Sequence, residues 1–573
     1  MSLLDGFRSL GKEINGAKGL TSDVKEGASG IEVDVLSLEK TDEELIEQKE
    51  AWEKGWSETR DTLRKMQDQN ENYWLNKQFS NYDVNDRPLV DNRIFPAVES
   101  FLPIATRQNP EPMVDSDESA IGIRLAKLAK TSIGIEADRT SLRLKVKQVA
   151  RHWSLYFVGA FKIGYTNGKK ETEPIRIHRL ILDPEATIDA KGIYRGEYLG
   201  EIKRKTAHEL IKEYPSSKEV ISEKVKGKLG TKINYAEWWT NEYVFWTLDK
   251  ELLGKSKNPH WNYDEKKQET VVDEMGLETV QEVDVIGKNH FEKPMMPYVF
   301  MTVFNLGTSP FDQTGLIWQS LSLQDLVNKR LRQTDANADN INGGWVVSEE
   351  RTGLTKEQAN RAILSVRKGY GLHIKRGNPA EAVHKIQGTP LPAEVYNQMV
   401  DARQEIDNIM GTHATTRGER TGQETASGRL LLKTQDESRI GLIADHIEQM
   451  VDTIFNWWVQ LDYVYTNTPE AAAEAFGNKY AEEWLTLLAT PDLPKLLVSV
   501  KEGSLLPKDD TTKRNEAMDL WKMQAIDPIS FYDRLGFPDP LETARQVFLW
   551  QTNPGAYLGL QSAQPQAPPA EAI

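Results

Sequence analysis

Apolar positions change their spacing twice along the chain, from helical to strand-like near residue 158 and back to helical near residue 313. Ahead of the first change, residues 1–40 have weak periodicity and predict a loosely ordered arm. Thr41 and Glu44 then form a capping box. The helix that follows carries its apolar residues at helical spacing, at Leu45, Trp52, Trp56, Leu63 and Met66. Further helices are predicted over about 91–107 and 117–157.

Residues from about 158 to 304 contain short alternating or β-branched runs, which turn residues separate. The predicted strands are Val158–Tyr165, Ile175–Leu182, Tyr198–Arg204, Trp238–Leu248, Thr270–Val272, Val280–Val285 and Tyr298–Phe304. Because helical segments flank them on both sides, we predict an α+β fold that is mostly helical.

The next part of the chain predicts two helices around a compact insert. The first helix begins near Gln313, and its apolar stripe ends before the polar stretch Gln333–Asn342. In the insert, Trp345–Val347 and Tyr370–Lys375 are strand-like and Lys356–Lys368 is helical.

The second helix ends at Gly411, and the glycine-rich segment GTHATTRGERTGQETASG follows it. A sustained heptad pattern then runs from Ile440 to Tyr465. This helix is apolar on more than one side, so we expect part of its surface to meet an adjacent subunit or the rest of the same chain. Residues 467–553 are predicted to be mostly helical around a strand-like Leu496–Val500. The last twenty residues end in QSAQPQAPPAEAI and are predicted to be disordered.

Composition narrows the function. The 573 residues include no cysteine, which excludes disulfides and thiolate chemistry. No apolar run approaches the ~20 residues of a membrane span, so we expect no membrane contact. The formal net charge of −15 argues against tight wrapping of DNA, because phosphate neutralisation supplies most nucleic-acid affinity. An acidic surface is compatible with DNA that slides past it.

Motifs of known catalytic sites are missing from the sequence, which contains no GxxxxGK[ST], HExxH, GxSxG or EF-hand pattern. The nine histidines are scattered without close metal-ligand spacing. Asp183, Glu185 and Asp189 cluster locally. They fit either a metal site for phosphodiester hydrolysis or, more simply, the solvation of turns. We therefore expect no metal and no cofactor.

Three stretches and the order of the predicted elements carry a family resemblance. The segment YWLNKQFSNYDVNDRPLVDNRIFPAVESFLP joins a Tyr-Trp helix end, a polar loop and an Asn-led helix. The second stretch comprises VGAFKIGY and IRIHRLILDPEATIDAKGIYRGEYLGEIKRKTAHELIKEYP, in which strands lead into an Asp-Pro and then a helix. The third stretch is KLLVSVKEGSLLPKDDTTKRNEAMDLWKMQAIDPISFYDRLGFPDP. With the later order of helix, insert, helix, glycine-rich loop and long helix, the chain resembles the portal proteins of tailed bacteriophages over roughly residues 41–553.

The resemblance implies a portal-like fold with a wing, stem, clip, tunnel loop and helical crown. On this chain the implied parts are a flexible arm (1–40), a wing (41–312), a stem helix (313–340), a clip (341–391), a second stem helix (392–411), a tunnel loop (412–427), a long wing helix (428–466), a wing-to-crown region (467–553) and a disordered tail (554–573). The crown is shorter and less regular than in portals with long helical barrels.

The implied function is structural and not enzymatic. Portals form a ring, usually a dodecamer, at one capsid vertex, and the ring conducts DNA during packaging and ejection. The implied partners are the terminase, head-completion or tail adaptor proteins, the major capsid or scaffolding protein, and double-stranded DNA. Twelve chains at −15 each would carry about −180, a wall that repels phosphate. The expected location is the virion, with assembly in the host cytoplasm.

The implied parts also suggest functional residues. In the tunnel loop, Arg417 and Arg420 would form a band of positive charge around the channel, beside Gly418, Glu419 and Gly422. Basic residues of the clip would dock partners, namely Arg351, Lys356, Arg361, Arg367 and Lys368. Those of the stem are Lys329, Arg330 and Arg332. A plain solvated loop and a plain solvated rim are the simpler alternatives for the first two sets.

Two rival functions stay open on the sequence. One is a metal-dependent DNA-processing enzyme that uses carboxylates such as Asp183 and Asp189. The other is a different virion scaffold or adaptor protein, which would lack the paired stem helices.

Overall fold

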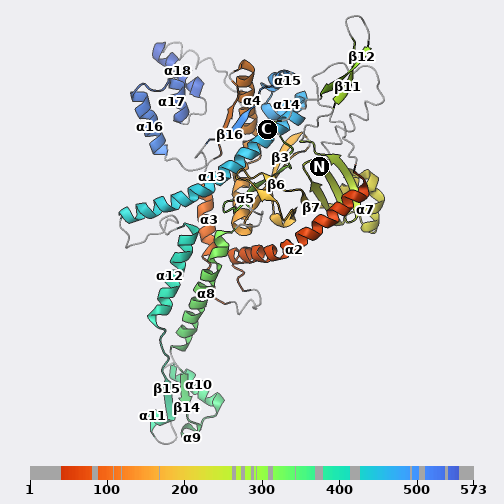
Figure 1. The fold of residues 1–573 in the computed structure, drawn as a ribbon. Coiled ribbons are helices and arrows are strands. Elements are labelled where there is room, and N and C mark those ends of the chain that lie inside the picture. The colour runs from red at the N-terminus through yellow and green to blue at the C-terminus, as the bar shows by residue number, and fades with distance from the viewer. Residues whose placement is uncertain are drawn as a thin grey trace, which may run out of the picture. The chain divides into compact units, whose positions relative to one another are not determined.

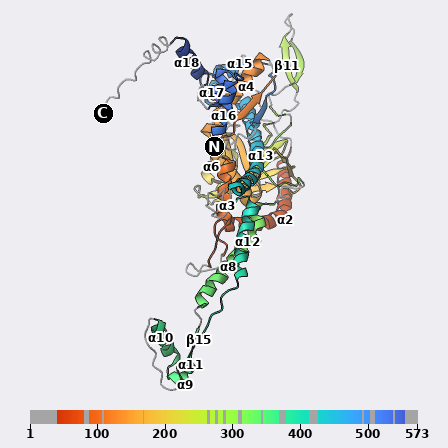
Figure 2. The same cartoon turned by 90° about the vertical axis from the view of Figure 1, so that its left-hand side faces the viewer.

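By its internal contacts, the computed structural model divides into two units, residues 1–505 and 506–573 (Figures 1 and 2). It describes residues 40–79, 88–106, 109–117, 119–166, 168–260, 266–272, 278–284, 290–291, 293–307, 314–341, 344–367, 378–412, 426–490, 493–501, 510–535 and 540–553. Helices predominate over strands, and the prediction of a mostly helical α+β fold is confirmed.

The helices of the first unit are α2 (Asp42–Trp74), α3 (Ile94–Ala105), α4 (Ala120–Arg139), α5 (Leu142–Tyr156), α6 (Ala207–Glu213), α7 (Lys218–Lys224), α8 (Leu316–Asn340), α9 (Glu349–Thr352), α10 (Lys356–Arg367), α11 (Pro379–Ala382), α12 (Ala393–Met410), α13 (Ala426–Tyr465), α14 (Pro469–Phe476) and α15 (Ala481–Leu488). Its strands are β1 (Pro112–Asp115), β2 (Gly159–Thr166), β3 (Lys169–Ile175), β4 (Leu180–Leu182), β5 (Thr187–Ile188), β6 (Tyr194–Arg195), β7 (Leu199–Thr206), β8 (Lys232–Trp239), β9 (Tyr243–Leu248), β10 (Glu251–Lys257), β11 (Lys266–Val272), β12 (Glu278–Asp284), β13 (Tyr298–Met301), β14 (Gly344–Val347), β15 (Val383–Ile386) and β16 (Leu497–Val500).

The capping box predicted at the start of α2 is present. The Glu44 backbone N–H donates to Thr41 Oγ1 at 3.3 Å, and the Thr41 N–H donates to Glu44 Oε2 at 2.8 Å. The apolar stripe of α2 is buried at Leu45, Trp52, Trp56 and Leu63. The helix prediction for this segment is confirmed.

The single helix predicted over 117–157 is wrong, because two helices, α4 and α5, occupy this stretch. The break falls at Thr140 and Ser141, where Ser141 adopts a left-handed backbone with φ 52°. Its N–H donates to the Asp138 carbonyl at 3.2 Å and closes a turn. Both helices bury one face, so the apolar periodicity continues past the break and conceals it.

Two antiparallel sheets form most of the strand region, one with the order β10-β9-β8-β7-β4 and one with the order β13-β2-β3. The strand predicted over Trp238–Leu248 is a hairpin, β8 and β9. At its turn the Tyr243 N–H donates to Thr240 Oγ1 at 3.0 Å. All of β9 and the end of β8 are buried, so the apolar run hides the turn. Likewise, the predicted run Ile175–Leu182 is divided between the end of β3 and β4.

α13 lies against elements from much of the first unit: α3, α4, β2, β13 and β16. Its second apolar side is buried at Ile443, Met450, Phe455 and Trp457. The sequence left two partners open for this helix surface, an adjacent subunit or the rest of the same chain. In the structure, the rest of the same chain covers it. The predicted strand near Leu496 is confirmed as β16, and it pairs with β1, which the sequence pattern did not predict.

The insert between α8 and α12 is built on its own two-stranded sheet, in which Trp345 of β14 lies opposite Lys385 of β15. The strand predicted at Trp345–Val347 and the helix predicted from Lys356 are confirmed. The other predicted strand, Tyr370–Lys375, lies outside the described residues. β15 was not predicted, because it follows the four-residue helix α11 and its side chains are mostly exposed.

The second unit contains α16 (Asp510–Lys522), α17 (Pro528–Arg534) and α18 (Pro540–Thr552). Trp521 stacks on Phe531 with the ring centroids 4.7 Å apart. In both units, none of the described helices combines the length and the apolar composition that crossing a membrane would need.

Candidate functional site

The helices α8 and α12 pack side by side as an antiparallel pair (Figures 1 and 2). Arg330 on α8 donates to Gln398 on α12 at 2.6 Å. Further along α8, Asn337 donates at 2.8 Å to the Thr389 carbonyl, which precedes α12. Residues later in α8 therefore contact residues earlier in the α12 region, so the two helices are antiparallel.

One end of this pair is buried and the other is not. The buried residues of α8 lie in its first half, at Ile317, Ser320, Leu321, Gln324, Val327 and Asn328. Those of α12 lie in its second half, at Ala402, Ile406 and Met410. Because the helices are antiparallel, both sets belong to the same end. From Lys329 to Ala338, no described side chain of α8 is buried.

The buried end is held by polar groups that we call the polar root: Asp91, Arg93, Gln324, Asn328 and Arg403. Gln324 Nε2 donates to the Asp91 carbonyl at 2.7 Å, and its Oε1 accepts the Arg93 N–H at 3.0 Å. Asn328 Oδ1 accepts the Asp91 N–H at 3.2 Å. Arg403 Nε donates to Asp91 Oδ2 at 2.8 Å. Gln324 and Asn328 are fully buried, where an unpaired amide would be costly.

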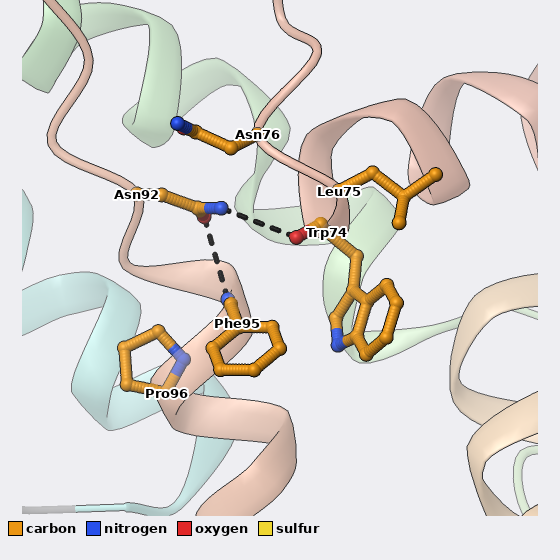
Figure 3. A pocket seen from close by; sticks show the side chains of 6 residues that line it. All are labelled: Trp74, Leu75, Asn76, Asn92, Phe95 and Pro96. Carbon is orange, nitrogen blue, oxygen red and sulfur yellow. Dashed lines mark hydrogen bonds between the residues drawn. The ribbon is translucent and has the colours of Figure 1, made fainter.

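The same loop forms a surface pocket between the end of α2 and the start of α3 (Figure 3). Asn92 Nδ2 donates to the Trp74 carbonyl at 3.2 Å, and Asn92 Oδ1 accepts the Phe95 N–H at 3.3 Å. The rings of Trp74 and Phe95 lie 5.2 Å apart. The pocket, of about 390 Å³, is lined by Trp74, Leu75, Asn76, Asn92, Phe95 and Pro96. None of these side chains titrates near neutral pH or acts as a nucleophile, so the pocket suits an apolar side chain.

Two of the three basic residues suggested for the stem are engaged within the chain. Arg330 NH1 donates to Gln333 at 2.7 Å, in addition to its contact with α12. Arg332 Nε donates to the Asn328 carbonyl at 3.2 Å, and its guanidinium lies 4.6 Å from the Phe79 ring centroid. Lys329 is exposed. Of the three, Lys329 therefore presents its charge to solvent.

The basic residues suggested for the clip are placed unevenly. Arg351 forms an ion pair with Glu381, while Lys356 and Arg361 are exposed on α10. Arg367 ends α10, and Lys368 lies outside the described residues. Over 341–391 the sequence has eight basic and four acidic residues. The four acidic residues therefore offset half of the positive charge of this insert.

The five residues suggested for the tunnel loop, Arg417, Gly418, Glu419, Arg420 and Gly422, lie outside the described residues. The two ends of this segment are described. α12 ends before Gly411, whose backbone is left-handed with φ 65°. α13 begins at Ala426, and further along it Arg439 donates to the Asn408 and Ile409 carbonyls at the end of α12. These bonds tie α12 to α13 across the loop.

A buried network of charges joins the two sheets, and its residues were not among those that the sequence suggested as functional. Lys162 on β2 donates to Glu201 on β7 at 2.8 Å and to Glu237 on β8 at 2.5 Å. Lys203 also donates to Glu237, and Tyr298 on β13 donates to Glu201 at 2.9 Å. Burial alone would raise the pKa of Glu237, but the two ammonium groups hold that pKa well below its usual range. One sequence signal could have indicated this network: Glu201 and Lys203 are two residues apart on one strand and therefore lie on the same face of the sheet.

The carboxylates considered for a metal site serve as acceptors in turns. Asp183 accepts the backbone N–H groups of Glu185 at 3.0 Å and Glu197 at 2.9 Å. Asp189 accepts those of Lys191 at 3.1 Å and Ile193 at 2.8 Å. This is the simpler of the two alternatives that the sequence offered. Within the described residues, no group of three or more His, Asp or Glu side chains is placed to hold a metal ion.

Comparisons with known proteins find similar solved structures but no family. No family model matches the sequence, and no curated protein matches it. Among solved structures, the chain is similar to one from the neck of an empty GTA particle computed with C6 symmetry. The two are 11% identical with a TM-score of 0.34, and the match covers 78% of this chain and 91% of that chain. A likeness of this degree assigns neither a fold family nor a function.

Proposed function

We propose that this chain is the subunit of a portal ring, which sits at one capsid vertex and conducts double-stranded DNA. The observation that carries the proposal is the arrangement of α8, the insert, α12 and α13. A small separate sheet lies in the sequence between two antiparallel helices, and the second helix is tied to a long helix that packs against the core. This is also the order of parts in the family that the sequence resembles.

The exposed end of the helix pair supports assembly with further copies of the chain. α12 exposes Tyr396 by 41% and Val400 by 45%, and the adjoining half of α8 has no buried described side chain. Apolar groups in such positions are typical of surfaces that other subunits cover. In a ring, each helix pair would pack against the pairs of its two neighbours.

The parts of the subunit then take the roles of stem, clip, tunnel loop and wing. The α8–α12 pair is the stem, and the insert is the clip on which the terminase and later the tail adaptors dock. The segment with Arg417 and Arg420 is the tunnel loop. The acidic charge of the assembled chains keeps DNA from adhering to the channel wall. Capsid or scaffolding protein would surround the wing.

Imaging and mass determination of the purified protein test the proposal directly. Negative-stain images should show rings with a central hole, and light scattering should give roughly twelve times the chain mass of 65.0 kDa. The double variant Tyr396→Glu/Val400→Glu should weaken the ring, because it places charge in the proposed contact. Leu306→Glu, at a residue 79% exposed, is the matched control and should assemble normally. A protein that stays monomeric across micromolar concentrations would contradict the proposal.

A further inference from the structure

α4 has one face in the core and one face exposed to solvent. The buried face, which includes Leu125, Leu128 and Ile133, packs against β1, α13, α14 and α15. In the same face, Ser132 Oγ donates to Asp462 of α13 at 2.7 Å. The helix is therefore firmly seated, and its opposite face is a fixed surface.

The exposed face of α4 combines basic and large apolar side chains. From Ala120 to Ile135 its large exposed residues are Ile121, Ile123, Arg124, Lys127, Lys130 and Ile135. Ile123 exposes 61% of its surface, Ile121 38% and Ile135 37%. We call this set the basic–apolar face. Ile123, Lys127 and Lys130 are spaced by four and three residues and so form one ridge of the helix.

The charge of this region is opposite to that of the chain. Residues 120–151 contain eight basic and two acidic residues, whereas the whole chain carries −15. Within this region Arg139 pairs with Glu136, Lys145 with Glu173 and Arg151 with Glu99.

The basic residues at the centre of the face have no such partners. The side chains of Arg124, Lys127 and Lys130 form no hydrogen bond or ion pair with any described residue. The nearest acidic residues along the sequence are Glu118, before the helix, and Glu136, whose buried carboxylate is paired with Arg139. An uncompensated basic surface in an acidic protein attracts an acidic partner.

The exposed isoleucines indicate the class of that partner. A phosphate backbone offers nothing to an aliphatic side chain, so a nucleic acid would leave all three isoleucines exposed. An amphipathic protein helix covers apolar groups with one stripe, and burial of an isoleucine stabilises a complex by about 1.5–3 kcal/mol before other costs. Carboxylates along the edge of that stripe would pair with Arg124, Lys127 and Lys130.

We propose that the basic–apolar face of α4 is a docking site for an acidic amphipathic helix of another protein. The complementary charges bring the helix to the surface, and Ile123, on the same ridge as Lys127 and Lys130, contributes the buried apolar contact. The proposal concerns a surface and a class of partner. It holds whether or not the chain conducts DNA.

A synthetic peptide can test the site on the full-length protein. The probe is a labelled helix of about 18 residues, or five turns, with leucines along one face and glutamates beside them. Fluorescence anisotropy should show that it binds about tenfold more tightly than a scrambled peptide of the same composition. Lys127→Glu/Lys130→Glu should weaken binding about tenfold, and Ile123→Ser several-fold. Lys218→Glu/Lys228→Glu, which changes exposed lysines elsewhere, should leave binding unchanged.

Three outcomes would overturn the proposal. Equal binding of the scrambled peptide would mean that charge alone is recognised. A 20-base-pair DNA duplex that binds with the same dependence on Lys127 and Lys130 would identify a nucleic-acid surface. A change in oligomer size in the Lys127→Glu/Lys130→Glu variant would identify a contact between copies of this chain. If Ile123→Ser lowers the melting temperature, the lysine pair decides the test.

Discussion

Burial determines which charged side chains matter for the stability of this protein. Glu237 is 1% exposed and bonds to Lys162, Lys203 and Trp239. Through these contacts one carboxylate links the two sheets. By contrast, the ion pair between Lys250 and Glu50 lies in solvent, where such pairs contribute little. The same residue types thus have very different weight in the two settings.

The substitution Glu237→Gln tests the buried network. It removes the buried charge that two partly buried lysines share, and breaking a buried ion pair costs about 3–5 kcal/mol because the remaining charges are left uncompensated. Urea unfolding should show a loss of stability of this size. Glu219→Gln, at an exposed position, should change stability by less than about 0.5 kcal/mol. Equal effects at the two sites would contradict the role of the network.

Buried histidines predict that the protein loses stability in mild acid. Burial lowers the pKa of His152 to about 4, and the nearby charges of Arg176 and Arg151 add to the shift while Glu71 opposes it. An unfolded histidine titrates near pH 6.5, so the unfolded chain takes up the proton first. Stability should therefore fall as the pH drops from about 6.5 to 4, by up to about 3 kcal/mol from this group.

The matching experiment compares His152→Gln with the unchanged protein. The variant should lose part of the decrease in melting temperature between pH 6.5 and 4, because glutamine does not titrate. His208→Gln, at an exposed histidine, should keep the full decrease. Identical pH profiles for all three proteins would show that His152 is not one of the groups responsible.

At the scale of elements, polar groups add defined contacts to the apolar packing that attaches the α8–α12 pair to the rest of the unit. The polar root places two buried amides of α8 and one arginine of α12 on a single loop. Such groups need defined partners and directions, whereas apolar contacts tolerate sliding. The polar root therefore holds the register of both helices against the loop.

The substitution Asp91→Ala should loosen this attachment. It removes the carboxylate that Arg403 and Arg93 share, and we expect a loss of about 1–2 kcal/mol in unfolding free energy. In a double-mutant cycle with Arg403→Met, the two effects should be less than additive because they remove one interaction. Asp335→Ala on the exposed half of α8 is the control. Additive effects would mean that the pair of residues contributes no coupling energy.

At the scale of the whole molecule, the proposed ring multiplies every charge by the number of subunits. An arginine in each tunnel loop would become a band around the channel, which would contact phosphates weakly and resist slippage of the DNA. The acidic groups elsewhere would repel the same DNA. Retention of the genome would then depend on a small number of cations rather than on the net charge.

The double variant Arg417→Glu/Arg420→Glu tests this role. Folding and ring assembly should be unchanged, because substitutions in a polar, glycine-rich loop such as the sequence predicts here usually alter stability by less than about 0.5 kcal/mol. Packaging or retention of DNA in assembled particles should fall. Lys329→Glu, at the exposed lysine of the stem, distinguishes a specific band from any loss of positive charge. Particles of the double variant that package and hold full-length DNA would contradict the assignment.

The sequence by itself determined the elements whose signals are local. Helical spacing located α2, α8, α12 and α13, and the Thr41 capping box located one helix start. Apolar spacing reports burial of one face and nothing else. The apolar pattern therefore continues across the break at Ser141 and across the hairpin turn at Thr240, because the elements on both sides are buried. For this reason the sequence predicted neither the break nor the turn.

Only the tertiary structure decided which polar residues are engaged and which are free. Asp91 meets Arg403 across 312 positions of the chain, and Lys170 meets Asp462 across 292. No local pattern encodes such pairs. For the same reason the sequence could not separate Arg330, which is bound to α12, from Lys329, which is exposed. The availability of a charge depends on the groups that the fold places opposite it.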